Sequence, residues 1–304
     1  MPVEPGWHGW LVIDKPLGLS SNRAVEIVRR ATGAKAGHAG TLDPLATGVL
    51  PIALGEATKT VRFAMADRKC YRFSIRWGVT RATDDGEGAI TGETAARPSR
   101  VAIEAVLPRF IGTILQSPPA YSAIKIGGRR AYALARAAAP PELAARPVAV
   151  AALRLLGMPD RDHADFDAVV GKGTYIRALA RDLAASLGTL GHVARLRRLS
   201  VGSFTEAQAI PLETVAVWRH IGDACGHLLP IETVLDGIPA LALAAAEAAR
   251  LRCGQCVTPC DPDGRAYLAR MDCGTLVGAW HDHALVALAR IENGGLRPLR
   301  VINR

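Results

Sequence analysis

The chain has 304 residues, of which 49% are hydrophobic and 21% charged, and its formal net charge is +9 at pH 7. This length is sufficient for two domains with buried cores. Its first residues have neither the basic start nor the apolar segment of a secretory signal, and a run of about 18 apolar residues is absent. We therefore expect a cytoplasmic protein rather than a secreted or membrane-spanning one.

The positive charge is unevenly distributed along the chain. Residues 231–304 hold equal numbers of basic and acidic side chains, so residues 1–230 carry the whole excess. A basic surface favours an anionic partner, although it does not say which one. We expect two domains, 1–230 and 231–304, with a boundary region between Pro230 and Pro239.

The first predicted elements are a strand and a helix. Residues 9–16 form an apolar run that ends at a proline, which is typical of a short buried strand. Ser21 is placed to cap a helix that continues to Ala31, with Gly33 near its end. A second apolar run over residues 48–54 predicts another strand.

The stretch GHAGTLDPLATG, residues 37–48, connects these strands. Asp43 is its only acidic residue, and between Ala36 and Gly55 the chain has no other Asp or Glu and no Lys or Arg. Asp before proline commonly starts a turn, and on that interpretation His38 is a hydrogen-bonded loop histidine. The alternative is that the isolated carboxylate is catalytic, and the stretch alone leaves both interpretations open.

The middle of the chain alternates between strand and turn patterns. Residues 71–79 alternate apolar and polar side chains, which predicts a half-buried strand, and residues 81–88 have the composition of a turn. Residues 101–111 are predicted to be helical. Residues 125–130 form a basic loop with two glycines. The alanine-rich stretch 131–152 is broken by prolines, so we expect a short helix and an extended linker.

The clearest amphipathic helix begins at Ile176. Apolar residues recur there at intervals of three and four as far as Leu187, just before Gly188. Beyond the boundary region, residues 241–252 predict a short helix. The remainder of the tail is predicted to form short strands joined by turns.

The sequence can be searched for the motifs of several known catalytic and binding chemistries. The segment GKGT, residues 171–174, precedes a helix whose N-terminus could bind an anion, but the P-loop pattern is absent. Lys172, Arg177 and Arg181 near this helix start either contact a nucleic-acid backbone or form a solvated basic face. No G-x-S-x-G motif supports a serine nucleophile. Paired-carboxylate chemistry stays open, although the loop around Asp43 supplies one acid rather than two.

Four of the six cysteines lie in the tail, spaced C-x2-C-x3-C-x12-C: Cys253, Cys256, Cys260 and Cys273. Paired thiolates can close a tetrahedral zinc site. The second pair is, however, spread more widely than in the usual zinc pattern. We therefore interpret these residues as free thiols and predict no metal.

Four segments, in the same order, resemble the TruB family of tRNA pseudouridine synthases. They are LVIDKPLGLSSN (11–22), GHAGTLDPLATGVLPIALGEATK (37–59), YSAIKIGGRRAY (121–132) and GKGTYIRALARDL (171–183). The similarity spans roughly residues 8–205 and continues through RLRRLSVGSF (195–204). Four ordered segments are far more specific than any one of them.

The resemblance implies a reaction, a partner and a fold. The reaction is isomerisation of uridine to pseudouridine at position 55 in the T loop of tRNA, with base flipping and without a metal, nucleotide or redox cofactor. The protein would act on tRNA as a monomer with no obligate protein partner. The implied fold is the α+β pseudouridine synthase fold with a mixed, largely antiparallel central sheet. A small β-rich, PUA-like C-terminal domain would follow.

The same match assigns catalytic roles. Asp43 falls on the essential aspartate, Tyr71 on the active-site tyrosine that packs on the uracil, and Arg177 on the arginine that pairs with the aspartate. His38 falls on the histidine that fills the gap left by the flipped base. Whether Asp43 attacks C1′ or C6, or takes the C2′ proton, stays open.

The remaining candidates are assigned to RNA binding. The basic loop matches a mobile thumb, about residues 122–147, and the motif at Lys15 flanks the cleft. Besides His38, the RNA-binding candidates are Lys15, Pro16, Lys125, Arg129, Arg130, Lys172, Tyr175 and Arg181.

Two alternative functions stay open. A guide-RNA-dependent rRNA synthase of the dyskerin type shares the aspartate loop, and a tRNA-binding folding factor would need no isomerase activity. The neutral tail favours the stand-alone tRNA enzyme over the dyskerin type.

Overall fold

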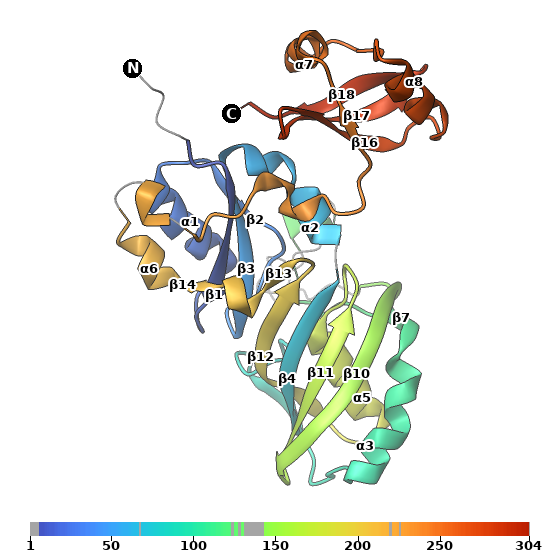
Figure 1. The fold of residues 1–304 in the computed structure, drawn as a ribbon. Coiled ribbons are helices and arrows are strands. Elements are labelled where there is room, and N and C mark those ends of the chain that lie inside the picture. Colours follow the sequence, from blue (N-terminus) through green and yellow to red (C-terminus); the bar gives the residue numbers. More distant parts are fainter. Residues whose placement is uncertain are drawn as a thin grey trace.

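The computed structural model describes residues 6–66, 68–122, 125–126, 129–130, 143–218, 221–224 and 226–303. A long mixed sheet organises most of them (Figure 1). In spatial order its strands are β14 (Ile210–Pro211), β1 (Gly9–Lys15), β3 (Ala46–Leu54), β12 (Gly191–Val201), β4 (Lys69–Trp77), β11 (His163–Val170), β10 (Arg146–Asp160) and β7 (Gly112–Gln116).

Most neighbouring strands of this sheet are antiparallel. The parallel pairs are β1 with β14 and β3 with β12. Two short strands complete the sheet, β2 (Ala36–His38) beside β3 and β13 (Phe204–Thr205) beside β12. The predicted α+β fold with a mixed, largely antiparallel sheet is therefore confirmed.

The helices that pack on the sheet form two groups. In the first, α5 (Ile176–Ser186) packs against β12, and α3 (Arg100–Val106) packs near β10. In the second, α1 (Ser21–Thr32) packs against α6 (Leu212–Ala216). Apart from the short pair β8 and β9 described below, the other described elements up to residue 234 are η1 (Gly55–Lys59), α2 (Val61–Ala66), β5 (Val79–Arg81), β6 (Ile90–Glu93), η2 (Leu107–Phe110), η3 (Glu206–Gln208), η4 (Ile221–Ala224) and η5 (Ile231–Val234).

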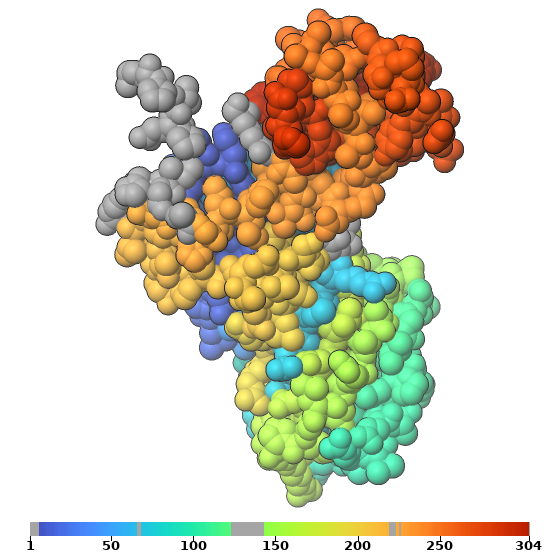
Figure 2. Space-filling view, viewed as in Figure 1, coloured from blue at the N-terminus to red at the C-terminus, as the bar shows by residue number. Residues whose placement is uncertain are grey.

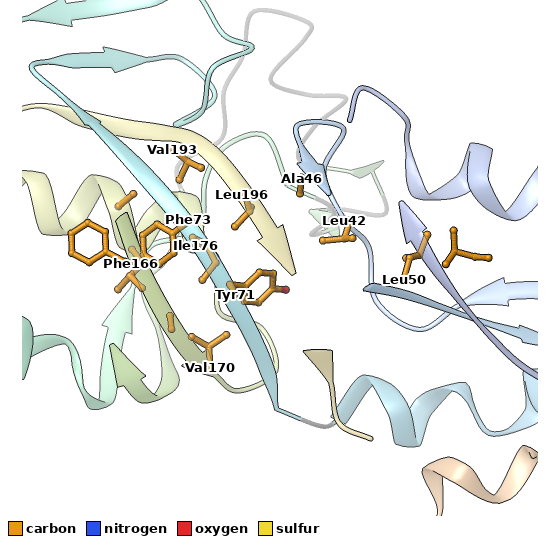
Figure 3. Close-up of a cluster of buried hydrophobic side chains, with 14 of the residues drawn as sticks. Leu42, Ala46, Leu50, Tyr71, Phe73, Phe166, Val170, Ile176, Val193 and Leu196 are labelled. Atoms are coloured by element: carbon orange, nitrogen blue, oxygen red, sulfur yellow. The ribbon is translucent and has the colours of Figure 1, made fainter. Parts of the chain in front are cut away.

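The main hydrophobic cluster joins buried side chains of the sheet with those of α5, α1, α3 and α6. Phe73 of β4 stacks on Phe166 of β11 with ring centroids 5.3 Å apart, and Trp77 meets Phe166 edge-on. Leu179 and Leu183 of α5 are fully buried in the same cluster. Figure 3 shows how this cluster continues from the aromatic side chains across β12 to the segment before β3.

The cap of α1 differs from the prediction. Ser20 is the N-cap, and its hydroxyl accepts a hydrogen bond from the Arg23 backbone N–H. Ser21 is the first helical residue, and its side chain is buried. The serine pair made a one-residue shift invisible in the sequence, because either serine can act as a cap.

Two other predictions fail in part. The segment predicted as a linker up to residue 152 enters β10 at Arg146, because this chain segment pairs with the edge strand β7. The tail contains an unpredicted helix, α8 (Pro262–Ala269). Asp261 caps α8 by accepting from the Gly264 N–H, so Asp263 and Gly264, an Asp-Gly pair of the kind common in turns, lie inside a helix.

The predicted thumb lies largely outside the described residues. Within it, β8 (Lys125–Ile126) pairs with β9 (Arg129–Arg130). The side chains of Lys125, Arg129 and Arg130 are not among those described.

A separate four-stranded sheet occupies the end of the chain. Its order is β15 (Ala240–Ala242), β16 (Leu276–His281), β17 (Ala284–Glu292) and β18 (Gly295–Val301), with α7 (Ala245–Arg252) packed against it. Figure 2 shows this lobe at one end of the molecule. Lys59 Nζ of η1 donates to the Val301 carbonyl at 2.7 Å, which ties the lobe to the larger part. Within the described ranges, no helix has the length and apolar character needed to span a membrane.

Gly48 marks the place where β3 and β12 come closest. It has a φ of +97°, and a Cβ on this residue would lie 2.2 Å from the Arg198 carbonyl oxygen. Arg198 is also its partner in the parallel pairing. Only glycine therefore permits this contact between the two halves of the sheet.

We predict that Gly48→Ala lowers the free energy of unfolding by at least about 2 kcal/mol, because it adds both backbone strain and a clash. Gly37→Ala in the neighbouring strand β2 is the control, since a Cβ there would meet no atom within 4 Å. Urea unfolding of both variants checks this. Equal stability of the two variants would contradict it.

Candidate active site

The site forms where the two halves of the sheet meet at β12. Asp43 lies on the connection between β2 and β3, and Arg177 lies in the first turn of α5. Arg177 Nε donates to Asp43 Oδ2 at 2.9 Å, across 134 residues of sequence. The Arg177 side chain is only 5% exposed, whereas that of Asp43 is 36% exposed. A buried cation therefore holds a carboxylate that solvent and a ligand can reach.

The other donors of Arg177 are also engaged. One terminal nitrogen donates to the Thr83 carbonyl at 2.8 Å, and the other donates to the Tyr121 carbonyl at 2.9 Å. Each of the three guanidinium nitrogens thus donates one hydrogen bond, which fixes the orientation of this buried group. Its Nε–H therefore points at Asp43 in a fixed direction.

Asp85 is the second carboxylate beside Arg177, and the sequence analysis did not identify it. Its Oδ2 lies 3.6 Å from Arg177 Nε, and its side chain is 3% exposed. Asp85 Oδ1 accepts from the Thr83 hydroxyl and from the Glu87 N–H. The sequence indicated only a turn at residues 81–88, and no local pattern distinguishes an acid that turns inward from one that faces solvent.

The backbone around Asp43 is held by buried side chains. The Ser21 hydroxyl donates to the Leu42 carbonyl at 2.9 Å and accepts from the Leu42 N–H at 2.8 Å. Lys15 Nζ donates to the carbonyls of Pro16 and Leu19 and, at 3.4 Å, to that of Pro44. The loop is thus fixed on both sides of the carboxylate.

Both interpretations of Asp43 have a structural counterpart. Its backbone carbonyl accepts from the Ala46 N–H at 3.0 Å, so the expected turn at Asp43-Pro44 is present. Its side chain is not used by that turn and pairs with Arg177 instead. The sequence predicted that His38 is hydrogen-bonded, and this prediction is wrong for one of its ring nitrogens. His38 Nδ1 is buried and has no hydrogen-bond partner within the described part of the chain.

Tyr71 projects from β4 beside this loop. Its side chain is buried in the same cluster as Leu42, Ile176 and Leu196. Figure 3 shows the ring at the junction of the two halves, with its hydroxyl directed toward the side of Leu42 and Leu50. The structure therefore brings the three catalytic candidates to one junction, although Tyr71 does not line the cavity described next.

A cavity of about 340 Å³ opens over the ion pair. Its lining residues are Asp43, Pro44, Thr83, Asp85, Glu87, Tyr121 and Arg177. Partial burial raises the pKa of Glu87, and the negative charges of Asp85 and Asp43 raise it further. Three carboxyl groups and one arginine thus face a space of nucleoside size.

The RNA-binding candidates occupy different environments. Lys172 and Pro16 are exposed, whereas Lys15 is fully buried, which differs from the surface position that contact with RNA requires. Tyr175 is fixed by two backbone hydrogen bonds with the Gln116 side chain. Arg181 donates to Asp84 and to the Ser117 carbonyl, so protein groups already engage it.

The tail cysteines do not form a cluster. Cys253, Cys256, Cys260 and Cys273 are free and exposed. Among the described residues, no group of three or more His, Cys, Asp or Glu side chains is arranged to hold a metal ion.

Solved structures share the overall fold of this chain. A chain of the archaeal box H/ACA sRNP Nop10–Cbf5 complex aligns with a TM-score of 0.70 and 23% identity, over 98% of this chain and 86% of that one. A chain of a Cbf5–Nop10–Gar1 complex aligns with a TM-score of 0.72 and 24% identity, over 98% and 85%. At these identities the likeness shows the fold alone.

Sequence comparisons identify the family. The model of the TruB family pseudouridylate synthase N-terminal domain matches residues 28–176, and that of the tRNA pseudouridylate synthase B C-terminal domain matches residues 177–236. A Bradyrhizobium diazoefficiens protein named tRNA pseudouridine synthase B is 51% identical over 97% of this chain and 86% of its own length. A Rhodospirillum rubrum protein of the same name is 50% identical over 97% and 96%. The chain therefore belongs to the TruB family of pseudouridylate synthases, and the predicted enzyme class is confirmed.

The buried Lys15 predicts a pH dependence of stability. Burial lowers the pKa of Lys15 from 10.5 to about 8, although Asp43 and Glu87 oppose this shift. The folded protein therefore releases this proton at lower pH than the unfolded chain does, so stability rises with pH between these two values.

We predict that the free energy of unfolding of the wild type, relative to Lys15→Met, grows by about 2 kcal/mol from pH 7 to pH 10. Methionine keeps the volume of the side chain and removes the titration. Urea unfolding of both proteins at each pH measures the difference. A difference that is constant or that shrinks with pH would show that Lys15 does not titrate in this way.

Proposed function

We propose that this protein is a cytoplasmic enzyme that isomerises uridine 55 in the T loop of tRNA to pseudouridine, and that Asp43 is its essential catalytic group. The name shared by its relatives supports tRNA as the substrate. The observation that carries the proposal is the hydrogen bond from the buried Arg177 to Asp43 at the cavity.

Asp43 presents one oxygen for reaction. Arg177 engages Oδ2, and Oδ1 receives no hydrogen bond from the described residues. Attack on C1′, addition to C6 and removal of the C2′ proton each require a free carboxylate oxygen. The charge-assisted bond to Oδ2 fixes the direction in which Oδ1 points.

The reaction exchanges one glycosidic bond for another. The bond from N1 to C1′ breaks, the uracil turns, and C5 joins C1′. C5 then loses its proton, and N1 gains one, so substrate and product are isomers. Tyr71 lies at the junction beside the Asp43 loop, where its ring can pack on the uracil and its hydroxyl can assist the loss of the C5 proton.

Access to Asp43 requires base flipping. A uridine stacked within the folded T loop cannot place its C1′ at a carboxylate inside a cavity, so the nucleotide must leave the stack. Unstacking costs a few kcal/mol, and contacts to the extruded nucleotide must offset it. The excess positive charge of residues 1–230 supplies attraction for the tRNA backbone.

We predict that the purified protein alone converts one uridine in the T arm of an unmodified tRNA transcript, without guide RNA or a protein partner. Asp43→Asn should lower the single-turnover rate by more than about 1,000-fold and leave tRNA affinity within about two-fold, because it removes a reacting oxygen but little binding surface. Asp167→Asn is the matched control, since Asp167 pairs with the exposed Arg72. Mapping pseudouridine in the product measures site and rate together.

The alternatives make different predictions in this assay. Full turnover by Asp43→Asn would exclude the catalytic role of this carboxylate. Activity only with an added guide RNA would favour the dyskerin-type function. Refolding of tRNA without any conversion would favour the folding factor.

A further inference from the structure

Arg198 of β12 is a fully buried arginine beneath the loop that carries Asp43. Its Nε donates to the Val49 carbonyl at 2.8 Å. Its terminal nitrogens donate to the carbonyls of Gly40, at 3.1 Å, and Thr41, at 3.4 Å. All three acceptors are backbone groups of the loop or of the strand that follows it.

Among the residues that the structure describes, no carboxylate forms an ion pair with Arg198. Of the described acids, none lies within 4.0 Å of its guanidinium nitrogens. Burial of an unpaired charge is costly, and backbone carbonyls compensate only part of the lost hydration. A neutral apolar residue would fill this core position without the free-energy cost of desolvating a charge. The distinctive contribution of the arginine is therefore its three hydrogen bonds to the loop and to β3.

The position of Arg198 in the sheet explains what these bonds control. In the register of β12, Arg198 is opposite Gly48 on β3 and opposite Tyr71 on β4. It therefore lies between the strand that follows Asp43 and the strand that bears Tyr71. The two loop carbonyls that it holds precede Asp43 by two and three residues.

We propose that Arg198 is a positioning residue of the isomerisation, which sets the placement of the Asp43 loop relative to Tyr71 and Arg177. The inference rests on the proposed catalytic role of Asp43. Ser21 holds Leu42 from the side of α1, and Arg198 holds Gly40 and Thr41 from the side of β12. Arg198 therefore links the loop directly to β12, the strand that lies between β3 and β4.

The charge of Arg198 also acts on groups that flank the loop. Burial lowers the pKa of His38, and the positive charge of Arg198 lowers it further. The same charge contributes to the lowered pKa of Lys15, where burial is the larger cause. His38 lies five residues before Asp43, and Lys15 donates to the Pro44 carbonyl directly after it. Arg198 therefore influences the electrostatics of the loop as well as its shape.

The test compares Arg198→Lys and Arg198→Met with Arg195→Met, using the full-length protein and an unmodified tRNA transcript. Lysine keeps the charge but cannot reach all three carbonyls, and methionine removes both. Arg195 lies on the same strand with a side chain that is 69% exposed, so it is the matched control. Circular dichroism and urea unfolding identify which variants are folded under assay conditions.

We expect kcat to fall about 10-fold in Arg198→Lys and about 100-fold in Arg198→Met, with KM within about two-fold, because a displaced carboxylate loses rate rather than tRNA binding. Arg195→Met should retain the kcat of the wild type. The inference is wrong if folded Arg198→Lys has the same kcat as the wild type. It is also wrong if the substitution changes KM and leaves kcat unchanged. If Arg198→Met does not fold, Arg198→Lys decides the result.

Asp43→Asn in the same assay separates the two proposals. An inactive Asp43→Asn beside a fully active Arg198→Lys refutes the role of Arg198 alone. An active Asp43→Asn refutes the proposed function itself.

Discussion

The hydrogen bond between Arg177 and Asp43 joins groups from the two halves of a sheet that meet at β12. Arg177 belongs to α5, which packs against β12, and Asp43 belongs to the connection that leads into β3. β12 is antiparallel to β4 and parallel to β3, so its register fixes both halves relative to each other. The geometry of the ion pair therefore depends on the packing along this strand, including the close contact at Gly48.

Burial makes this arrangement rigid. A guanidinium with 5% exposure must satisfy its donors inside the protein, and Arg177 donates to two carbonyls and to Asp43, while Asp85 lies at ion-pair distance. Loss of a partner would leave the buried charge of Arg177 less compensated, which is costly. Because separation of the ion pair is unfavourable, the site is assembled before the substrate binds. Groups that are already in place need no reorganisation during the reaction.

The sequence predicted those features that depend on local pattern. Apolar periodicity located the strand at Gly9–Lys15 and the helix that begins at Ile176, and the family resemblance supplied the mixed sheet. The α8 helix was missed because Asp-Gly has the same appearance in a turn and in a first helical turn. Asp85 and the loop contacts of Arg198 were missed for a different reason. Their partners lie about a hundred residues or more away in the sequence, and no local periodicity reports such contacts.

We propose that Arg177 orients Asp43, the carboxylate to which we assign the reaction. The most direct measurement is the single-turnover rate of Arg177→Met at saturating tRNA, with tRNA affinity measured on the same preparation. The account predicts a loss of at least about 100-fold in rate with affinity within about two-fold of the wild type. A folded Arg177→Met that converts uridine at the rate of the wild type would contradict it.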